Sequence, residues 1–407
     1  MTDEAPYAAR DSFPELPANL VSADSHVTEP PHTYVSRIDP KYRDRAPHIF
    51  REDDGGDSFV IDGIPGRIPL GIIAAAGKDP RKIKKGEIPF EALHRGGWDP
   101  KARIADQDRD GVAGEVIYPS VGMMLCNHPD AEYKQACMMA YNGWLAEEFC
   151  AAAPDRLFGL GQTAVLSVEQ TIKDFEKFKE MGFKGVMMPG SPATDIPYHH
   201  PDFDPLWRAS VELNLPISFH ILTSRSDGNN PLDDLAKDSG AGSDSVKTFM
   251  YGNQLIKALQ NLAGQFIFGH IFERVPGLKV VLVEGDAGWA PHYIERLNHA
   301  YDRHRFTLGV DGMKTLPGDL FKENIYLTFQ DDPVAWKTAD LMNPNRLLWA
   351  NDFPHTDASW PYSQDIFRRN AQGLSEELVR KIVYENNAEL YDIPIPAEPA
   401  KAAATAA

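Results

Sequence analysis

The sequence predicts a (β/α)8 barrel, because eight short apolar segments alternate with helical segments along most of its 407 residues. The predicted strands are centred near residues 21, 116, 160, 186, 218, 281, 326 and 348. A barrel with insertions reaches this length as a single domain. An open, doubly wound sheet is the alternative fold, but no glycine-rich dinucleotide-binding loop follows any of the predicted strands.

The first quarter of the chain departs from regular alternation. After the opening strand, residues 30–98 are rich in Pro, Gly and charged residues and show little periodicity, which predicts an insertion. Asp99 followed by Pro100 is typical of a helix start, and we expect this helix to run to about Asp110. The next predicted elements are a buried strand at 115–119 and a long helix at 129–153.

From residue 157 onwards the alternation becomes regular. The predicted strands occupy residues 157–165, 184–188, 217–220, 278–284, 325–328 and 346–350. The predicted helices occupy residues 168–181, 205–213, 244–263, 290–304, 333–341 and 375–385. A polar stretch at 223–243 interrupts this pattern after the fifth strand and predicts a second insertion.

We therefore expect one barrel domain over residues 20–392, with an N-terminal arm over 1–19 and a flexible tail over 393–407. The arm is acidic and Pro-rich without an apolar centre, so we do not expect it to act as a signal peptide. The tail consists largely of Pro and Ala and lacks packing potential.

Composition narrows the class of partner. A net charge of −18 argues against nucleic acid and against anionic membranes, because both require a basic surface. No apolar run is long enough to span a bilayer. The spacing of Cys126, Cys137 and Cys150 fits neither a disulfide framework nor a zinc cluster and favours a reducing cytoplasm. The expected partner is a small-molecule substrate.

The stretch Asp24-Ser25-His26-Val27-Thr28-Glu29 lies at the end of the first predicted strand. Alternate residues of a strand share a face, so Asp24 and His26 are expected to point the same way, with Glu29 following from the loop. A carboxylate and an imidazole placed side by side can bind a divalent metal. Taken alone, the stretch is more typical of a strand exit in which Asp caps a backbone amide. A metal site requires partner ligands elsewhere.

Such partners follow other predicted strands, at the end of a barrel where catalytic residues gather. His220 ends the fifth strand, Glu284 ends the sixth, and Asp352 follows the eighth with His355 nearby. Each has a plain alternative: His220 as a core histidine, Glu284 as a partner of helix amides, and Asp352 as a helix cap. Together with the first-strand motif, they predict a metal site at the barrel mouth.

Three of these features resemble the amidohydrolase superfamily in its amidohydrolase-related branch, which includes non-oxidative decarboxylases of aromatic substrates. They are Asp24-x-His26, His220 and the run Asn351-Asp352-Phe353-Pro354-His355. The segment 272–279 resembles the same branch, and the likeness covers residues 20–392. The resemblance implies that Asp24, His26, His220 and Asp352 bind the metal and that Asp352 also moves protons.

The chain departs from the family pattern at two positions. Asp24 stands where the superfamily commonly has His, and Glu284 stands where its decarboxylases place a catalytic His. The bridging lysine of the dinuclear hydrolases has no counterpart, since Lys184 begins a predicted strand. A carboxylate-rich site shifts the metal preference toward Mn or Fe, while Zn stays compatible with it. We expect one or two divalent ions, with Glu29 as a further ligand.

The resemblance and the ligand set favour an enzyme that hydrolyses a small, carboxylated or aromatic substrate with metal-activated water. Asp352 would be the general base, and Glu284 or His355 would orient the substrate or relay protons. One alternative is a non-oxidative decarboxylase that uses the same site. Others are a dinuclear Fe or Mn hydroxylase, with Glu29 and Glu284 as second-metal ligands, and a non-catalytic metal-binding subunit. A homo-oligomer such as a dimer, or a complex with a paralogue, is also expected.

Overall fold

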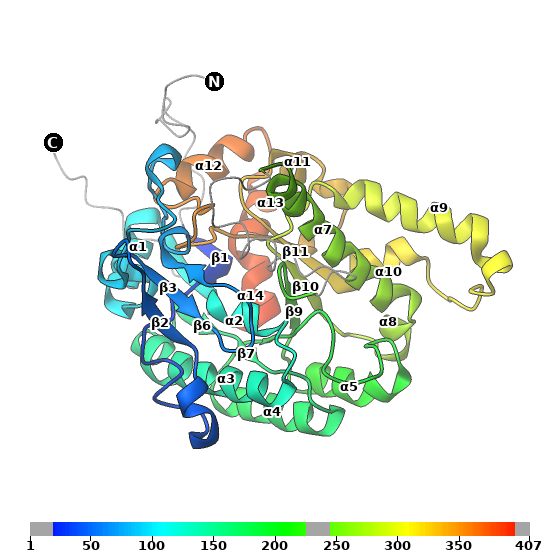
Figure 1. Ribbon diagram of the computed structural model, residues 1–407. Coiled ribbons are helices and arrows are strands. Elements are labelled where there is room, and N and C mark those ends of the chain that lie inside the picture. The colour runs from blue at the N-terminus through cyan, green and yellow to red at the C-terminus, as the bar shows by residue number, and fades with distance from the viewer. Residues whose placement is uncertain (1–18, 225–244, 395–407) are drawn as a thin grey trace.

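The computed structural model describes residues 19–224 and 245–394, with parallel strands at the centre and helices around them (Figure 1). The barrel strands are β1 (Leu20–His26), β5 (Val112–Tyr118), β6 (Leu157–Gly159), β7 (Gly161–Gln162), β8 (Val186–Met187), β9 (Ile217–His220), β10 (Val280–Val283), β11 (Ile325–Phe329) and β12 (Leu347–Trp349). All neighbouring barrel strands pair in parallel, in the orders β1-β5-β6 and β12-β11-β10-β9-β8-β7. Since β6 and β7 are two parts of one predicted strand, the eight predicted positions are occupied and the (β/α)8 barrel is confirmed.

The ring closes between β1 and β12 through irregular hydrogen bonds instead of a regular ladder. The Asp352 amide donates to the Asp24 carbonyl at 3.0 Å, and the His26 amide donates to the Phe353 carbonyl at 2.7 Å. The Asn351 amide donates to the Ser22 hydroxyl at 3.0 Å. The seam of the barrel therefore joins the two chain segments that carry the predicted ligands of the first and eighth strands.

The helices surround this ring. They are α1 (Pro100–Asp110), α2 (Val121–Leu125), α3 (Ala131–Trp144), α4 (Val168–Glu180), α5 (Asp204–Glu212), α7 (Ser245–Phe268), α8 (Ile271–Arg274), α9 (Ala290–Leu308), α10 (Pro317–Asn324), α11 (Pro333–Lys337), α12 (Ser363–Asn370), α13 (Glu376–Arg380) and α14 (Asn386–Tyr391). A π-helical turn, Leu145–Phe149, extends α3, and another, Lys381–Glu385, joins α13 to α14.

Several short helices, among them α10 and α12, are absent from the sequence-based expectation. Both α10 and α12 have eight residues, and each buries only one pair of adjacent large apolar side chains. Those pairs are Leu320 with Phe321 and Ile366 with Phe367. Such short segments contain too few apolar positions to show a helical period.

The predicted start of α1 is confirmed in detail. The Asp99 carboxylate accepts hydrogen bonds from the amides of Lys101 and Ala102, with Pro100 at the first helical position. At the other end, Gly111 adopts a left-handed conformation with φ of 70°, which ends the helix at little steric cost. These two ends fix the position of α1 relative to β5, which begins at Val112.

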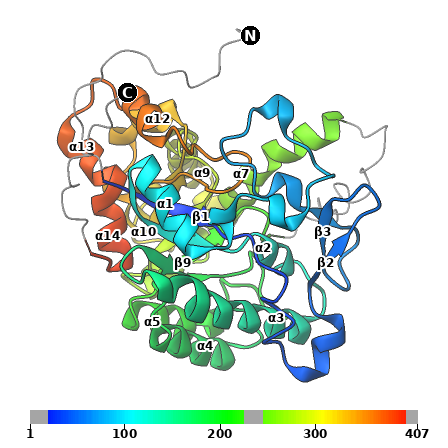
Figure 2. The same cartoon turned by 90° about the vertical axis from the view of Figure 1, so that its left-hand side faces the viewer.

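The segment between β1 and α1 contains a small antiparallel sheet of β2 (His48–Arg51), β3 (Asp57–Val60) and β4 (Ile68–Pro69), and β2 and β3 lie to one side of the barrel (Figure 2). Its later part contacts the loops at the mouth. The Ala76 amide donates to the Pro354 carbonyl at 3.0 Å, and the Thr28 amide donates to the Gly97 carbonyl at 2.7 Å.

Other predicted segments lie wholly or mostly outside the described residues. They are the arm over 1–19, the second insertion over 223–243 and the tail over 393–407. Within the described ranges, no helix is long and apolar enough to cross a membrane.

Replacing the cap of α1 tests this part of the fold. Asp99→Ala removes the side-chain acceptor of two helix amides and should cost about 1 kcal/mol of stability, which lowers the thermal midpoint by roughly 1 to 3 °C. Asp99→Asn retains a capping oxygen and should stay close to wild type. Differential scanning calorimetry checks both variants, and equal losses in the two would show that the cap is not responsible.

Candidate metal centre

Two overlapping groups of possible metal ligands lie at the ends of β1, β9, β10 and β12. Within each group, one ligand atom of every member lies within 4.8 Å of those of the others. The first group consists of Asp24, His26, His220 and Glu284. The second group consists of His26, Glu284, Asp352 and His355. The structure thus brings together all the predicted site residues except Glu29.

The backbone directs these side chains toward the mouth. The pairing of β1 with β5 is irregular between Ser22 and Ser25, just where Asp24 lies. Glu284 and Asp352 follow their strands in the left-handed conformation, with φ of 59° and 53°. This conformation is sparsely populated by residues other than Gly, costs on the order of 1 kcal/mol at each position, and is common where function fixes a side chain.

Each of the two buried histidines has one ring nitrogen occupied by a backbone carbonyl. His26 Nδ1 lies 2.9 Å from the Pro119 oxygen, and His220 Nδ1 lies 3.1 Å from the Ile221 oxygen. Because a carbonyl can only accept, Nδ1 must carry the proton in both rings. In the neutral rings, the lone pairs of the two Nε2 atoms then face the cluster, which is how metal-binding histidines are usually oriented.

The atoms that face one another across the cluster are all acceptors in this state. His26 Nε2 lies 3.3 Å from both Asp24 Oδ1 and Asp352 Oδ1. His220 Nε2 lies 3.5 Å from Asp24 Oδ1 and 3.2 Å from Glu284 Oε2. These atoms are buried and lack a hydrogen-bond partner among the described residues. A divalent cation within the first group would satisfy the facing acceptors of Asp24, His26, His220 and Glu284.

The electrostatics of the cluster also call for a cation. Burial opposes the protonation of His26, but hydrogen bonds and charges from Asp24 and Asp352 raise its pKa well above the usual value. Burial, followed by the charges of Asp352 and Asp24, raises the pKa of Glu284 well above its usual value. The site therefore attracts positive charge. The mixed nitrogen and oxygen ligands are suited to a divalent ion such as Mn, Fe or Zn.

Asp352 and His355 form a pair beside the first group. Asp352 Oδ1 lies 3.0 Å from His355 Nδ1, and the His355 ring stacks on that of His26 with centroids 3.9 Å apart. His355 Nε2 lies 2.8 Å from Ser120 Oγ, which donates its own proton to the Val27 carbonyl at 2.7 Å. The Ser120 oxygen must then accept from His355, so Nε2 carries a proton. Sequence reasoning missed Ser120, although it follows the second predicted strand directly.

Glu29 is placed differently from its predicted role as a metal ligand. It is fully buried, and its carboxylate accepts hydrogen bonds from the amides of Val121 at 3.1 Å and Gly122 at 3.0 Å. The Tyr34 hydroxyl also faces it at 3.5 Å. These donors at the start of α2 occupy the carboxylate, and Glu29 belongs to neither ligand group. The geometry thus gives Glu29 a part in attaching the loop after β1 to α2.

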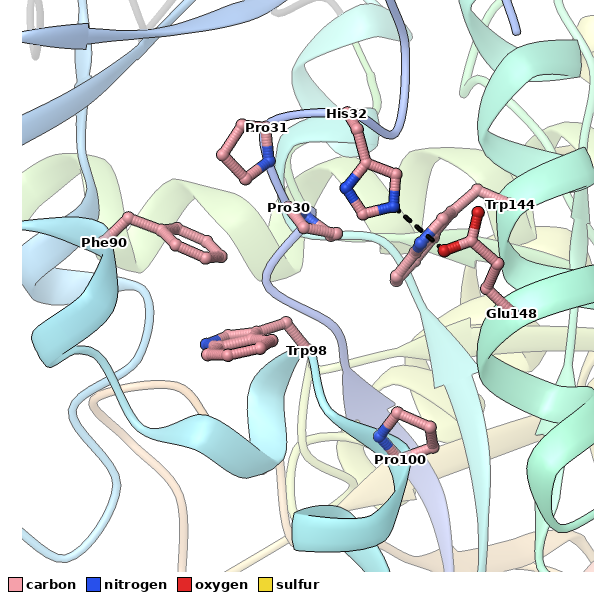
Figure 3. A pocket seen from close by; sticks show the side chains of 8 residues that line it. All are labelled: Pro30, Pro31, His32, Phe90, Trp98, Pro100, Trp144 and Glu148. Atoms are coloured by element: carbon pink, nitrogen blue, oxygen red, sulfur yellow. Dashed lines mark hydrogen bonds and ion pairs between the residues drawn. The ribbon is translucent and has the colours of Figure 1, made fainter. Parts of the chain in front are cut away.

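A cavity of about 260 Å³ lies outside the ligand cluster, and none of the candidate ligands lines it. Figure 3 shows Phe90 and Trp98 facing Trp144 and Glu148 across this cavity. His32 Nε2 contacts Glu148 Oε2 at 2.9 Å on its rim. Because insertion residues form one wall and the end of α3 the other, the cavity marks the junction of the insertion with the barrel.

Comparisons with known proteins agree with this fold. A family model described as amidohydrolase matches residues 24–393. An amidohydrolase from Mycobacterium avium subsp. paratuberculosis K-10 is similar in structure, with 22% identity, a TM-score of 0.71, and coverage of 92% of this chain and 99% of that chain.

Two decarboxylases are also similar in structure. For 5-carboxyvanillate decarboxylase from Sphingomonas paucimobilis, the identity is 20%, the TM-score is 0.63, and 93% of this chain and 100% of that chain are covered. For dihydroxybenzoic acid decarboxylase from Polaromonas sp. JS666, solved with bound manganese and the inhibitor 2-nitroresorcinol, the identity is 17%, the TM-score is 0.60, and the coverage is 92% and 97%. At these identities, the structural similarities establish the fold.

Removing one imidazole tests the metal centre. His220→Ala takes away a ligand whose Nε2 faces Asp24 and Glu284, so the affinity for Mn²⁺ should fall by about 100-fold or more. His270→Ala is the matched control, because His270 pairs with Glu273 on α8 and belongs to neither group. Isothermal titration of the metal-free protein with Mn²⁺ measures both. Equal affinities of His220→Ala and wild type would contradict the assignment.

Proposed function

Because the chain belongs to the amidohydrolase family, we propose that it is a metal-dependent carboxy-lyase that releases carbon dioxide from a small hydroxylated aromatic carboxylate. The sequence favours hydrolysis, with decarboxylation by the same site as the alternative. Two of the structurally similar proteins are decarboxylases of aromatic acids, which supports the alternative.

The arrangement of the ligands supports a single primary metal position. Asp24, His26, His220 and Glu284 would hold the ion, since their ligand atoms form one compact group. A bound divalent ion would supply a Lewis acid that anchors and polarises an oxygen of the substrate. Glu284 is the only member of this group whose side chain is partly exposed, at 19%, and it would therefore also meet and orient the substrate.

The observation that carries the proposal is the pair formed by Asp352 and His355. His355 Nε2 is protonated toward Ser120 and its Nδ1 faces the Asp352 carboxylate at 3.0 Å, so a further proton taken up by the pair would lie between these two atoms. The pair would store that proton next to the ligand group. Decarboxylation needs such a donor, because the carbon that loses its carboxylate must gain a proton.

The proposed step balances in the following way. Asp352 delivers its proton to the ring carbon that bears the carboxylate. The bond between this carbon and the carboxylate carbon then breaks, its electron pair returns to the ring, and carbon dioxide leaves. After carbon dioxide leaves, the pair regains one proton from solvent through the partly exposed His355 imidazole, and Ser120 Oγ keeps that imidazole in the orientation needed for the transfer.

Space for a small substrate lies beside His220. A cavity of about 240 Å³ is lined in part by Asn127, Ser191 and Thr223. None of the candidate ligands lines this cavity, but Thr223 in its wall donates its hydroxyl to the backbone carbonyl of His220 at 2.7 Å. The polar lining would offer hydrogen bonds to hydroxyl or carboxylate groups of a substrate.

A substrate screen tests the proposal. Mn²⁺-loaded protein should release carbon dioxide from at least one aromatic acid that carries a hydroxyl group beside the carboxylate. In deuterium oxide, the product should carry one deuteron at the vacated carbon. Amide and ester analogues of the same acids should remain intact, and turnover should be the same without dioxygen. Hydrolysis of those analogues without release of carbon dioxide would contradict the proposal, and turnover that requires dioxygen would favour the dinuclear hydroxylase.

Replacing the proton carrier tests its role. Asp352→Asn conserves volume but cannot carry a proton, so kcat should fall by about 100-fold or more. Mn²⁺ should still bind within a few-fold of wild type, because the first ligand group is intact. Asp174→Asn is the matched control, since Asp174 is also a buried carboxylate but bonds to Thr163 and Gln135 away from the cluster. Full activity of Asp352→Asn would rule out the step described above.

A further inference from the structure

Arg103 lies on α1 with its side chain fully buried, and its guanidinium has four partners. It forms an ion pair with the Glu115 carboxylate on β5. Nη1 donates to the carbonyls of His26 at 2.8 Å and Gly96 at 3.2 Å, and Nη2 donates to the carbonyl of Phe353 at 3.4 Å. One buried side chain thus contacts the end of β1, the insertion and the loop after β12.

Two of these carbonyls belong to the chain segments that carry the ligand groups. His26 is itself a candidate ligand in both groups, and Phe353 follows Asp352 directly. These segments meet at the barrel seam, where the His26 amide donates to the Phe353 carbonyl at 2.7 Å and no regular ladder joins the strands. Arg103 therefore links both sides of the seam at the point where the ligands emerge.

The partner of Arg103 is itself fixed by hydrogen bonds that reach the same segments. Glu115 accepts from Gln107 Nε2 at 2.6 Å and from Ser25 Oγ at 3.2 Å. Ser25 Oγ also contacts Asn351 Oδ1 at 2.8 Å. Ser25 stands between Asp24 and His26 in the sequence, and Asn351 directly precedes Asp352. The network around Glu115 thus contacts a residue adjacent to a ligand on each side of the seam.

Stability alone does not account for a buried charge at this position. A buried ion pair is generally no more stabilising than apolar residues of similar volume, because both charges lose their hydration. The planar guanidinium, however, offers donors in fixed directions, which neither Lys nor an apolar side chain can reproduce. Its three carbonyl partners come from segments far apart in the sequence, so it fixes their relative positions.

We propose that Arg103 is a positioning residue of the metal centre, which sets the spacing between the ligands on β1 and the Asp352 segment before metal binds. Interactions beyond the direct ligands typically change metal affinity by about 10-fold to 100-fold. Arg103→Lys retains the charge but loses the fork of donors. The affinity of the metal-free protein for Mn²⁺ should therefore fall by about 10-fold or more.

Arg156 offers a matched control on the same two elements. It pairs with Asp108 on α1 and donates to the carbonyls of Val112 and Ala113 at the start of β5, at the opposite end of the barrel from the ligands. Arg156→Lys removes a comparable fork of donors but should leave the Mn²⁺ affinity within about twofold of wild type.

The experiment compares Mn²⁺ binding and the electron paramagnetic resonance spectrum of bound Mn²⁺ in these variants, together with their thermal midpoints. Arg103→Lys should bind more weakly than Arg156→Lys even at equal thermal midpoints, and its zero-field splitting should differ from that of wild type. Wild-type affinity and spectrum in Arg103→Lys would overturn the proposal. An equal loss of affinity in Arg156→Lys would also overturn it, because general destabilisation would then explain both results.

A milder variant covers the case in which Arg103→Lys does not fold. Gln107→Met removes one donor to Glu115 without touching the charge pair, and it should lower the Mn²⁺ affinity several-fold. Unchanged affinity in Gln107→Met would then overturn the proposal. The inference rests on the metal centre and not on decarboxylation, and all these measurements are made without substrate, so a failed substrate screen and a failed positioning test remain distinguishable.

Discussion

Buried carboxylates and imidazole lone pairs face one another at the mouth of this barrel, and this arrangement is unfavourable without a cation. Asp24 is wholly buried, and the carbonyl partners of His26 and His220 leave Nε2 of each neutral ring as an acceptor. In the neutral rings these contacts of 3.2 to 3.5 Å set acceptors against acceptors, and without a metal the cluster relieves this by taking up protons, in keeping with the raised pKa values of His26 and Glu284. The unfavourable electrostatic interactions are concentrated in this cluster of ligands, and binding of a divalent ion would relieve them.

The rest of the structure is arranged to keep these groups in position. The seam between β1 and β12 joins the two segments that carry Asp24, His26 and Asp352, and α1 contacts that seam through Arg103. Glu29 attaches the loop after β1 to the start of α2. Ser120, which directly precedes α2, orients His355. Interactions outside the cluster therefore control the geometry within it.

Local periodicity explains why the barrel and the facing of the first two ligands could be predicted correctly from the sequence. The alternation of short apolar strands with helices predicts the barrel, and period two within β1 predicts that Asp24 and His26 share a face. The rule that catalytic groups follow barrel strands predicts the contributions of His220, Glu284 and Asp352 to one cluster. Short helices such as α10 and α12 contain too few apolar residues for their period to be recognised.

The remaining features depend on tertiary contacts that no local pattern encodes. Glu29 has the residue type and spacing of a ligand, yet the amides of α2 occupy its carboxylate. Arg103 lies within an ordinary polar helix pattern, and only the closed barrel reveals that its guanidinium meets the seam. Ser120 becomes significant because His355, more than two hundred residues away in the sequence, lies 2.8 Å from it.

Anomalous X-ray scattering at the manganese edge, from crystals of the protein grown with Mn²⁺, tests the central claim most directly. We predict a strong peak within bonding distance of Asp24 and of the Nε2 atoms of His26 and His220. A map without a peak there, or with manganese only at other sites, would contradict the assignment of these residues as the metal centre.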